Sequence, residues 1–247
     1  MTRNEWCRKN AALRRHRHSL VANSNWTSKI ARRDHVFENP ENIATIFPSV
    51  DLETFQPNDK LKVRKSLGIN EEEFVLGFGC AAITDVNKNF GGFLEIINGL
   101  ETKRRTAVIV FGEGDVPDHI GGVKVYRQGP LQSEREIADL YSAMDLFYVT
   151  SKMETFCQVA IEAQACGTPV CAFNVGGISD AIEHQETGML FEFGDINSMI
   201  KFTSQFRGDE RMRTRMQAKG ISRAREDFSV EKMCDSYLEV YEKALKS

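Results

Sequence analysis

Two glutamates, Glu154 and Glu162, lie eight positions apart in the stretch E-T-F-C-Q-V-A-I-E. Eight residues of helix span roughly 12 Å along the axis, and the sugar and the ribose of a nucleotide-sugar are separated by a similar distance. Because a carboxylate accepts hydrogen bonds from two hydroxyl groups, each glutamate could bind a vicinal diol. The alternative, which a glutamate pair alone would favour, is that Glu154 complements the helix dipole and Glu162 is a solvated helix residue.

A helix over residues 156–166 is expected to position this pair, because these residues are good helix formers with no internal glycine or proline. Gly167 occupies the usual position after a helix, and a proline two residues later blocks its continuation. Glu154 or Thr155 would cap the first turn and leave the amides of residues 156–158 without partners. Free amides at the positive end of the helix dipole favour an anion such as a diphosphate.

Further short motifs occur on both sides of the glutamates. They are Val21-Ala-Asn-Ser24, Ile46-Phe-Pro-Ser-Val-Asp51, Phe55-x-Pro57, Arg64-x-x-Leu-Gly68-Ile, Lys88-Asn-Phe-Gly-Gly, Ser151-x-x-Glu154-Thr-Phe, Glu162-Ala-x-Ala-Cys-Gly-Thr-Pro-Val, Gly176-Gly177-Ile178, Thr187-Gly188-Met189-Leu190, Phe228-Ser and Tyr237-x-x-x-Tyr241. In this order they resemble the donor domain of retaining GT-B glycosyltransferases of family 4, and the resemblance covers nearly the whole chain.

The resemblance implies roles for the residues at the matching positions. Glu162 would hold the ribose hydroxyls, Glu154 would hold hydroxyls of the transferred sugar, and Lys88 would neutralise the departing diphosphate. Lys88 and Glu154 are thus the expected catalytic residues. The expected donor-binding residues are Lys88, Glu154 and Glu162 together with Gly79, Gln128, Leu131, Thr155, Phe156, Cys157, Gln158 and Val159.

The implied reaction transfers a hexose from a UDP- or GDP-linked sugar to a glycan or a lipid-linked acceptor. It proceeds with retention at the anomeric carbon and without a bound metal or other cofactor, so catalysis would depend on a fixed cation and helix amides that stabilise the leaving group. An alternative left open is a truncated module that binds a nucleotide-sugar without transferring it. A dinucleotide-binding interpretation of Gly77-Phe-Gly79 is disfavoured, because the next acidic residue after a strand, Glu113, follows about thirty positions later rather than ~20.

The sequence departs from the family pattern at three points. Ala82 occupies a position at which many members have an arginine, and Cys157 replaces the glycine that is common after Glu-x-Phe. The third departure is that almost the whole first domain is missing. Met1 is therefore interpreted as the start of a truncated frame, of a fragment or of one half of a split enzyme, and a partner that supplies the acceptor domain is expected.

Three parts of the chain follow from this interpretation. We expect residues 1–50 to be a remnant of the acceptor domain with its linker, residues 51–225 to be the nucleotide-sugar-binding domain, and residues 226–247 to be the C-terminal crossover helix. Apolar residues recur at three- and four-residue spacing in this last helix. If nothing covers the resulting stripe, it predicts a homodimer or poor solubility.

Short apolar runs alternate with amphipathic segments in the middle of the chain. Ser133 and Glu136 predict a capping box at the start of one helix. The predicted strands cover residues 74–80, 106–112, 123–126, 146–149 and 170–173, and a further helix is expected over residues 90–100. Near-continuous apolar strands separated by helices predict an α/β fold with a doubly wound, Rossmann-like parallel sheet. Ligands of such sheets bind beyond the carboxyl ends of the strands, where the predicted site residues lie.

Charge is unevenly distributed along the chain. Residues 1–33 contain nine lysines or arginines and one glutamate, a net charge of +8 in a chain whose total is −3. We interpret this region as a solvated face, with weak attraction to an anionic membrane surface as the alternative. Nucleic-acid binding is disfavoured, because no known motif accompanies the charges.

The six cysteines show neither a C-x-x-C pair nor metal-ligand spacing. The chain contains no signal-peptide pattern and no apolar run of membrane length. A reduced cytoplasmic protein is therefore expected, with a peripheral location at the inner membrane face as the alternative.

Overall fold

The computed structural model describes residues 19–33, 43–101, 103–131 and 133–246, together with residues 4, 5, 7, 8 and 11. No helix in these ranges is long and apolar enough to cross a bilayer, and they contain no group of three or more His, Cys, Asp or Glu side chains that could hold a metal ion. The predicted basic N-terminal surface stays a prediction. Five of its nine basic side chains lie outside the described residues, namely Arg3, Lys9, Arg14, Arg15 and Arg17.

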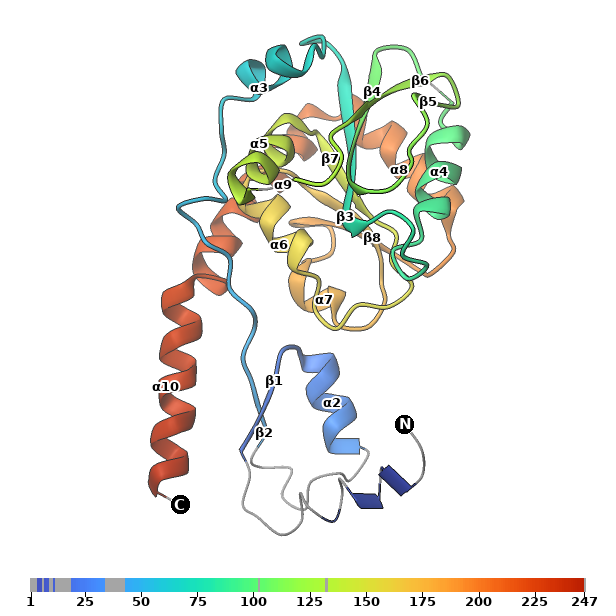
Figure 1. Ribbon diagram of the computed structural model, residues 1–247. Helices are drawn as coiled ribbons and strands as arrows, with labels where there is room; N and C mark the ends of the chain where they lie inside the picture. Colours follow the sequence, from blue (N-terminus) through green and yellow to red (C-terminus); the bar gives the residue numbers. More distant parts are fainter. Residues whose placement is uncertain are drawn as a thin grey trace.

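A seven-stranded sheet forms the centre of the main domain (Figure 1). Its spatial order is β5-β6-β4-β3-β7-β8-β9. Every neighbouring pair is parallel except β5 and β6, which pair antiparallel. The strands are β3 (Phe74–Ala82), β4 (Thr106–Glu113), β5 (His119–Ile120), β6 (Val123–Arg127), β7 (Leu146–Val149), β8 (Val170–Phe173) and β9 (Gly188–Phe191). The predicted α/β fold with a mostly parallel sheet is confirmed.

Two hydrophobic cores cover the two faces of this sheet. Alternate residues of a strand point to opposite faces, so the odd-numbered residues of β4 from 107 to 111 pack in one core and the even-numbered residues between them pack in the other. The first core contains α5 and α6, and the second contains α4 and α8. The helices of the domain are α3 (Lys60–Leu67), α4 (Phe90–Gly99), α5 (Glu134–Ala143), α6 (Gln158–Ala165), α7 (Ile178–Ala181), α8 (Ile196–Gly208) and α9 (Glu210–Asp227).

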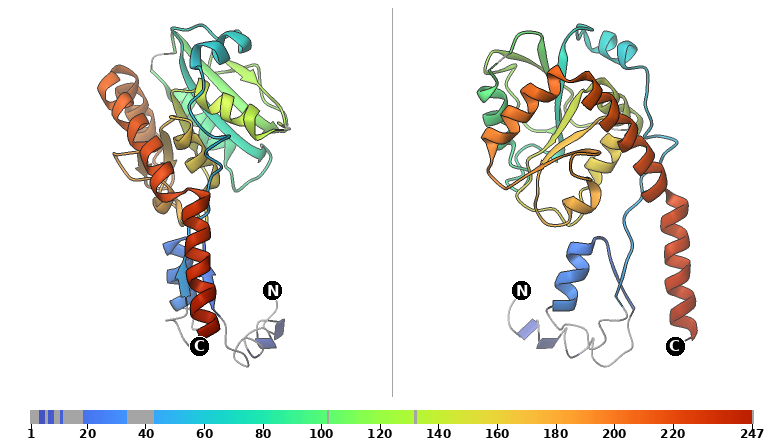
Figure 2. Two further views of the ribbon diagram at one scale, coloured as in Figure 1. Left: turned by 90° about the vertical axis from the view of Figure 1, so that its left-hand side faces the viewer. Right: turned by 180° about the vertical axis from the view of Figure 1, so that it is seen from behind.

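A small unit near the start of the chain lies beside the main domain (Figures 1 and 2). In this N-terminal unit, β1 (Leu20–Ala22) and β2 (Ile43–Thr45) pair in parallel, and α2 (Asn25–Arg33) packs against them. Asn25 donates its backbone and side-chain N–H groups to the two carboxylate oxygens of Asp180, at 2.7 and 2.8 Å. A carboxylate of α7 therefore caps the first turn of α2.

The C-terminal helix α10 (Val230–Lys246) projects from the main domain (Figure 2). It contains no buried residue. Leu238, Tyr241 and Leu245 are 57%, 59% and 88% exposed, so within the described residues the predicted apolar stripe is uncovered. The homodimer and the division of the chain into three parts stay predictions.

Candidate functional site

The order of the strands reverses beside β3. The chain adds β4 and then β6 on one side of β3, whereas β7, β8 and β9 follow on the other side. The carboxyl ends of β3 and β7 therefore lie next to each other, with Phe78 opposite Tyr148. In open parallel sheets this reversal point is where ligands bind. Lys88 follows β3 and Glu154 follows β7, so the topology brings both predicted catalytic residues to this place.

Lys88 and Glu154 form a direct ion pair. The distance from Lys88 Nζ to Glu154 Oε1 is 2.8 Å, and the side chains are 30% and 12% exposed. Burial lowers the pKa of Lys88. The hydrogen bond and the charge of Glu154 raise it by more than burial lowers it, so this pKa lies above its ordinary value. The lysine is therefore a fixed positive charge at neutral pH, within reach of any ligand that contacts Glu154.

The helix after Glu154 begins later than the sequence predicted. The expected helix over residues 156–166, with Thr155 or Glu154 as its cap, is wrong at its start. α6 begins at Gln158, and its N-cap is Cys157, which makes no side-chain capping bond.

The late start of α6 has a physical cause in Phe156. Its ring is buried and stacks on Phe47 with the ring centroids 5.6 Å apart. The chain turns inward for this contact and reverses at Cys157, whose φ is 94°. Glycine adopts such a conformation readily and other residues rarely do. The cysteine therefore stands at a position where the backbone favours glycine.

The turn and the start of α6 present unpaired amides. Among the described residues, no acceptor of the protein receives a hydrogen bond from the backbone amides of residues 155–159. The next amide, of Ala160, donates to the Cys157 carbonyl at 3.2 Å. The positive end of the helix dipole points to the same place. The segment therefore offers N–H donors to an anion, and those within the helix belong to Gln158 and Val159.

Two glycines after β8 hold the glutamate loop in place. The Gly177 amide donates to the Glu154 carbonyl at 2.8 Å. A Cβ atom on Gly176 would lie 1.9 Å from that carbonyl oxygen, and one on Gly177 would lie 2.1 Å from the Thr155 carbonyl oxygen. Only glycine allows such a close approach of two backbones, so the Gly176–Gly177 pair fixes the main chain at Glu154.

Glu162 is not a solvated helix residue. Its side chain is half-buried in α6 and accepts a hydrogen bond from the hydroxyl of Tyr141 at 3.3 Å. Burial raises the pKa of Glu162 to about 7; the charge of Glu134 adds to this effect, and hydrogen bonds from Tyr141 and Gln158 oppose it. The site therefore contains a carboxyl group that lacks much of its hydration.

The remaining predicted residues are not joined to these groups. Gly79 lies within β3, where a Cβ atom would come 2.0 Å from the ring of Phe111, so packing accounts for this glycine. Gln128 and Leu131 follow β6. The Gln128 amide donates to the Val110 carbonyl at 2.9 Å, and Leu131 packs against the first core. Within the described part of the chain, no hydrogen bond links these two residues to either glutamate, and their contact with a donor stays a prediction.

Three residues outside the predicted set of site residues contact the site loops. Asn23 donates its side-chain N–H to Thr155 Oγ1 at 3.2 Å, and Asn89 and Thr150 join the loops that carry Lys88 and Glu154. Asn23 and Asn89 both stand in quoted motifs, Val21-Ala-Asn-Ser24 and Lys88-Asn-Phe-Gly-Gly, and these motifs were the one signal for them. Nothing in the sequence distinguishes Thr150 from other threonines.

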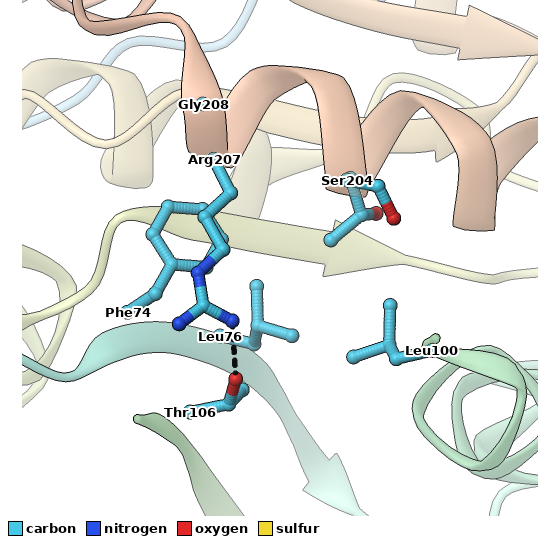
Figure 3. A pocket seen from close by; sticks show the side chains of 8 residues that line it. Phe74, Leu76, Leu100, Thr106, Ser204, Arg207 and Gly208 are labelled. Carbon is cyan, nitrogen blue, oxygen red and sulfur yellow. Dashed lines mark hydrogen bonds between the residues drawn. The ribbon is translucent and has the colours of Figure 1, made fainter. Parts of the chain in front are cut away.

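A hollow of about 290 Å³ lies at the opposite end of the strands, where β3 and β4 begin (Figure 3). Phe74 and Thr106 line it, and both begin their strands. Arg207 donates to Thr106 Oγ1 at 2.9 Å and lies over the ring of Phe74. Since Lys88 and Glu154 follow the carboxyl ends of their strands, this pocket is separate from the candidate site.

The fold and the site together define a class of protein. A parallel sheet whose reversal point presents a lysine, a carboxylate and unpaired amides is typical of proteins that bind phosphorylated ligands. The chain belongs to the glycosyl transferases group 1 family, whose sequence model matches residues 59–223. This confirms the resemblance to GT-B glycosyltransferases, whereas retention and the assignment to family 4 stay predictions.

Known proteins show the same relationship. The D-inositol 3-phosphate glycosyltransferase of Thermobifida fusca is 30% identical over 222 residues, which cover 84% of this chain and 51% of that protein. Anabaena Alr3699/HepE, solved in complex with UDP, has a TM-score of 0.84 at 21% identity and covers 98% of this chain and 68% of its own. Sucrose-phosphate synthase (tll1590) of Thermosynechococcus elongatus has a TM-score of 0.83 at 21% identity. The match covers 99% of this chain and 62% of the synthase chain. The two structures share the fold, and the chain spans about half the length of its curated relative.

Proposed function

We propose that this chain is the donor-binding part of a glycosyltransferase that moves a hexose from a nucleotide-sugar to a glycan or a lipid-linked acceptor, with retention. The observation that supports this most directly is the 2.8 Å contact between Lys88 and Glu154 at the reversal point of the sheet. Unpaired amides precede and begin α6 beside it. A cation, a carboxylate that accepts from hydroxyls and a group of amides are the components that a diphosphate-linked sugar requires.

Each group would act on a different part of the donor. The diphosphate would bind to the amides and to Lys88, which together would stabilise the negative charge that develops on the leaving nucleotide. Glu154 would accept hydrogen bonds from hydroxyls of the sugar, next to the same lysine. The oxygen of an acceptor hydroxyl would then form a bond to the anomeric carbon as the bond to the phosphate oxygen breaks, and the hydroxyl proton would pass to the departing diphosphate.

Glu162 would bind the ribose. The hydroxyl of Tyr141 contacts Glu162 Oε2 at 3.3 Å and restricts the orientation of the carboxyl group. Burial raises its pKa to about 7, which reflects lost hydration. Two ribose hydroxyls would supply hydrogen-bond donors in place of water, so binding would stabilise the ionised form.

Neighbouring proteins suggest the first ligands to test. Anabaena HepE was solved with UDP and with UDP-glucose, so UDP comes before GDP in the choice of donor. Relatives from Thermobifida fusca and Rhodococcus opacus are named after D-inositol 3-phosphate. This polyol phosphate therefore belongs in an acceptor panel beside glycans and lipid-linked sugars.

Titration calorimetry with UDP, GDP, ADP and their glucose conjugates tests the donor site. We expect one nucleotide to bind and its sugar conjugate to bind at least as tightly. A protein that binds none of them, by calorimetry and by thermal shift, would contradict the proposal.

Transfer by this chain alone requires a separate test, because the chain spans about half the length of its relatives. The alternative is a module that binds the nucleotide-sugar without transfer activity. Acceptor-dependent product formation, measured with and without a protein that supplies an acceptor domain, separates the two. Product in either assay supports the enzyme, and donor binding without product in both supports the module.

A further inference from the structure

The loop that carries Lys88 has no regular secondary structure, yet the lysine meets Glu154 at hydrogen-bond distance. This loop, residues 83–89, lies between β3 and α4. The Lys88 amide donates to the Asp85 carbonyl at 3.0 Å. That bond forms a turn inside the loop but does not fix the loop relative to β7. Contacts with the neighbouring loop, residues 150–154, must therefore set the position of the lysine.

Two asparagines on either side of Lys88 join the two loops. The Asn87 carbonyl accepts from the Lys152 amide at 2.8 Å, and the Asn87 side chain donates to the Met153 carbonyl at 3.0 Å. Asn89 Nδ2 donates to the Thr150 carbonyl at 3.1 Å. The lysine is thus flanked on both sides by residues that contact the loop of Glu154.

Thr150 makes the reciprocal contacts. Its hydroxyl donates to the carbonyl of Lys88 at 3.1 Å and to that of Asn89 at 2.9 Å. Because a hydroxyl group has one proton, the two carbonyls share it. Thr150 is 0% exposed, so water does not readily replace this donor if it is removed.

Asn89 has the backbone geometry that these contacts require. Its φ and ψ are 53° and 52°, in the left-handed region that asparagine tolerates better than most residues. Its side chain lies over the first turn of α4, where a Cβ atom on Gly92 would come 2.7 Å from Asn89 Nδ2. A glycine at position 92 therefore leaves room for the asparagine side chain to reach Thr150.

We propose that Thr150 and Asn89 form a clamp that positions Lys88 against Glu154 and thereby arranges the donor site. The proposal rests on the proposed function of Lys88 as the residue that contacts the diphosphate. Thr150 is a positioning residue, because it holds the main chain at Lys88 and acts on the donor only through that lysine.

Three substitutions test the clamp in the full chain. Thr150→Val removes the hydroxyl at nearly constant size, and Thr150→Ser keeps it. Thr203→Val is the matched control, because Thr203 is 2% exposed and its hydroxyl also has two partners, the Met199 carbonyl at 2.7 Å and the Tyr148 hydroxyl at 2.5 Å, in the core on the other face of the sheet. With UDP and GDP as probes, we expect Thr150→Val to weaken binding about tenfold, the size expected for one or two buried hydrogen bonds. Thr150→Ser and Thr203→Val should stay within about twofold of the unsubstituted chain.

A second background separates positioning from a general loss of structure. If Thr150 acts through the lysine, Thr150→Val should change affinity by less than about twofold when Lys88→Met is already present, since the two substitutions remove one interaction. An equal loss in both backgrounds would overturn the proposal. So would an affinity of Thr150→Val equal to that of the unsubstituted chain.

Hydrogen exchange on the protein without nucleotide distinguishes failure of the clamp from failure of the proposed function. We expect the Lys152 amide, which donates to Asn87, to exchange faster in Thr150→Val. Faster exchange in a chain that binds neither nucleotide would leave the clamp standing and contradict the donor site. Unchanged exchange and unchanged affinity in a chain that binds nucleotide would overturn the clamp and leave the donor site standing.

Discussion

Cys157 occupies a backbone position that favours glycine, and replacing it tests the description of the turn before α6. Its φ and ψ are 94° and 77°, and its side chain is 5% exposed. Cys157→Gly relieves backbone strain but removes the buried thiol. Cys157→Ala also removes the thiol and keeps the Cβ atom, so the difference between the two variants isolates the strain from the loss of the sulfur.

The expected difference between these variants is small but has an unusual sign. A residue in a sparsely populated backbone region costs about 2 kcal/mol, which glycine avoids. Glycine loses about 0.8 kcal/mol of buried methyl group and about 0.7 kcal/mol of backbone entropy relative to alanine. Cys157→Gly should therefore be about 0.5 kcal/mol more stable than Cys157→Ala. At Ala160, which is fully buried inside α6, the same two losses apply without relief, so Ala160→Gly should cost about 1.5 kcal/mol.

Urea unfolding measures both differences from the transition midpoints, provided that the m-values agree. The description of the turn predicts that the free energy of unfolding of Cys157→Gly equals or exceeds that of Cys157→Ala. The contradicting result compares two losses of stability, that of Cys157→Gly relative to Cys157→Ala and that of Ala160→Gly relative to the unsubstituted chain. If the two losses are equal, the backbone at position 157 is not strained. The account of where α6 begins would then be wrong.

Two further substitutions test the charged groups. Burial raises the pKa of Glu162 to about 7, so the folded protein takes up a proton more readily than the unfolded chain and gains stability as the pH falls through 7. Glu162→Gln removes the charge at every pH. It should therefore stabilise the fold by up to about 3 kcal/mol at pH 8 and by much less at pH 5. Urea unfolding at the two pH values checks this, and a difference independent of pH would contradict it. Asp145→Asn should cost about 3 kcal/mol, because the 4% exposed side chain of Arg64 loses its carboxylate partner at 2.7 Å. Asp118→Asn, whose pair with Arg127 is exposed, should change the thermal midpoint little, and equal losses would contradict the role of Asp145.

Much of the central sheet could be predicted because its inner strands are continuous apolar runs. Residues 146–149 and 170–173 coincide with β7 and β8, and the capping box of Ser133 and Glu136 is present at the start of α5. β9 was not predicted, because it lies at an edge of the sheet and three of its four residues are only half-buried. A short, partly exposed strand has neither the apolar run of a central strand nor a clear alternation.

The site could be predicted in part. Lys88 and Glu154 both follow predicted strands, so a parallel sheet placed them at one edge. The start of α6 could not be predicted, because it depends on a ring contact between Phe156 and Phe47, residues more than a hundred positions apart. The role of Thr150 depends on two carbonyls of another loop. Contacts of this kind leave no trace in the local sequence.

The central claim is that Glu154 and Glu162 bind opposite ends of one donor, and calorimetry with UDP and UDP-glucose tests it most directly. Glu162→Ala should weaken the binding of both ligands by ~1–3 kcal/mol, because the ribose is common to them. Glu154→Ala should leave the affinity for UDP unchanged and weaken only the binding of UDP-glucose. Equal losses for both ligands in both variants would contradict the assignment of the two ends.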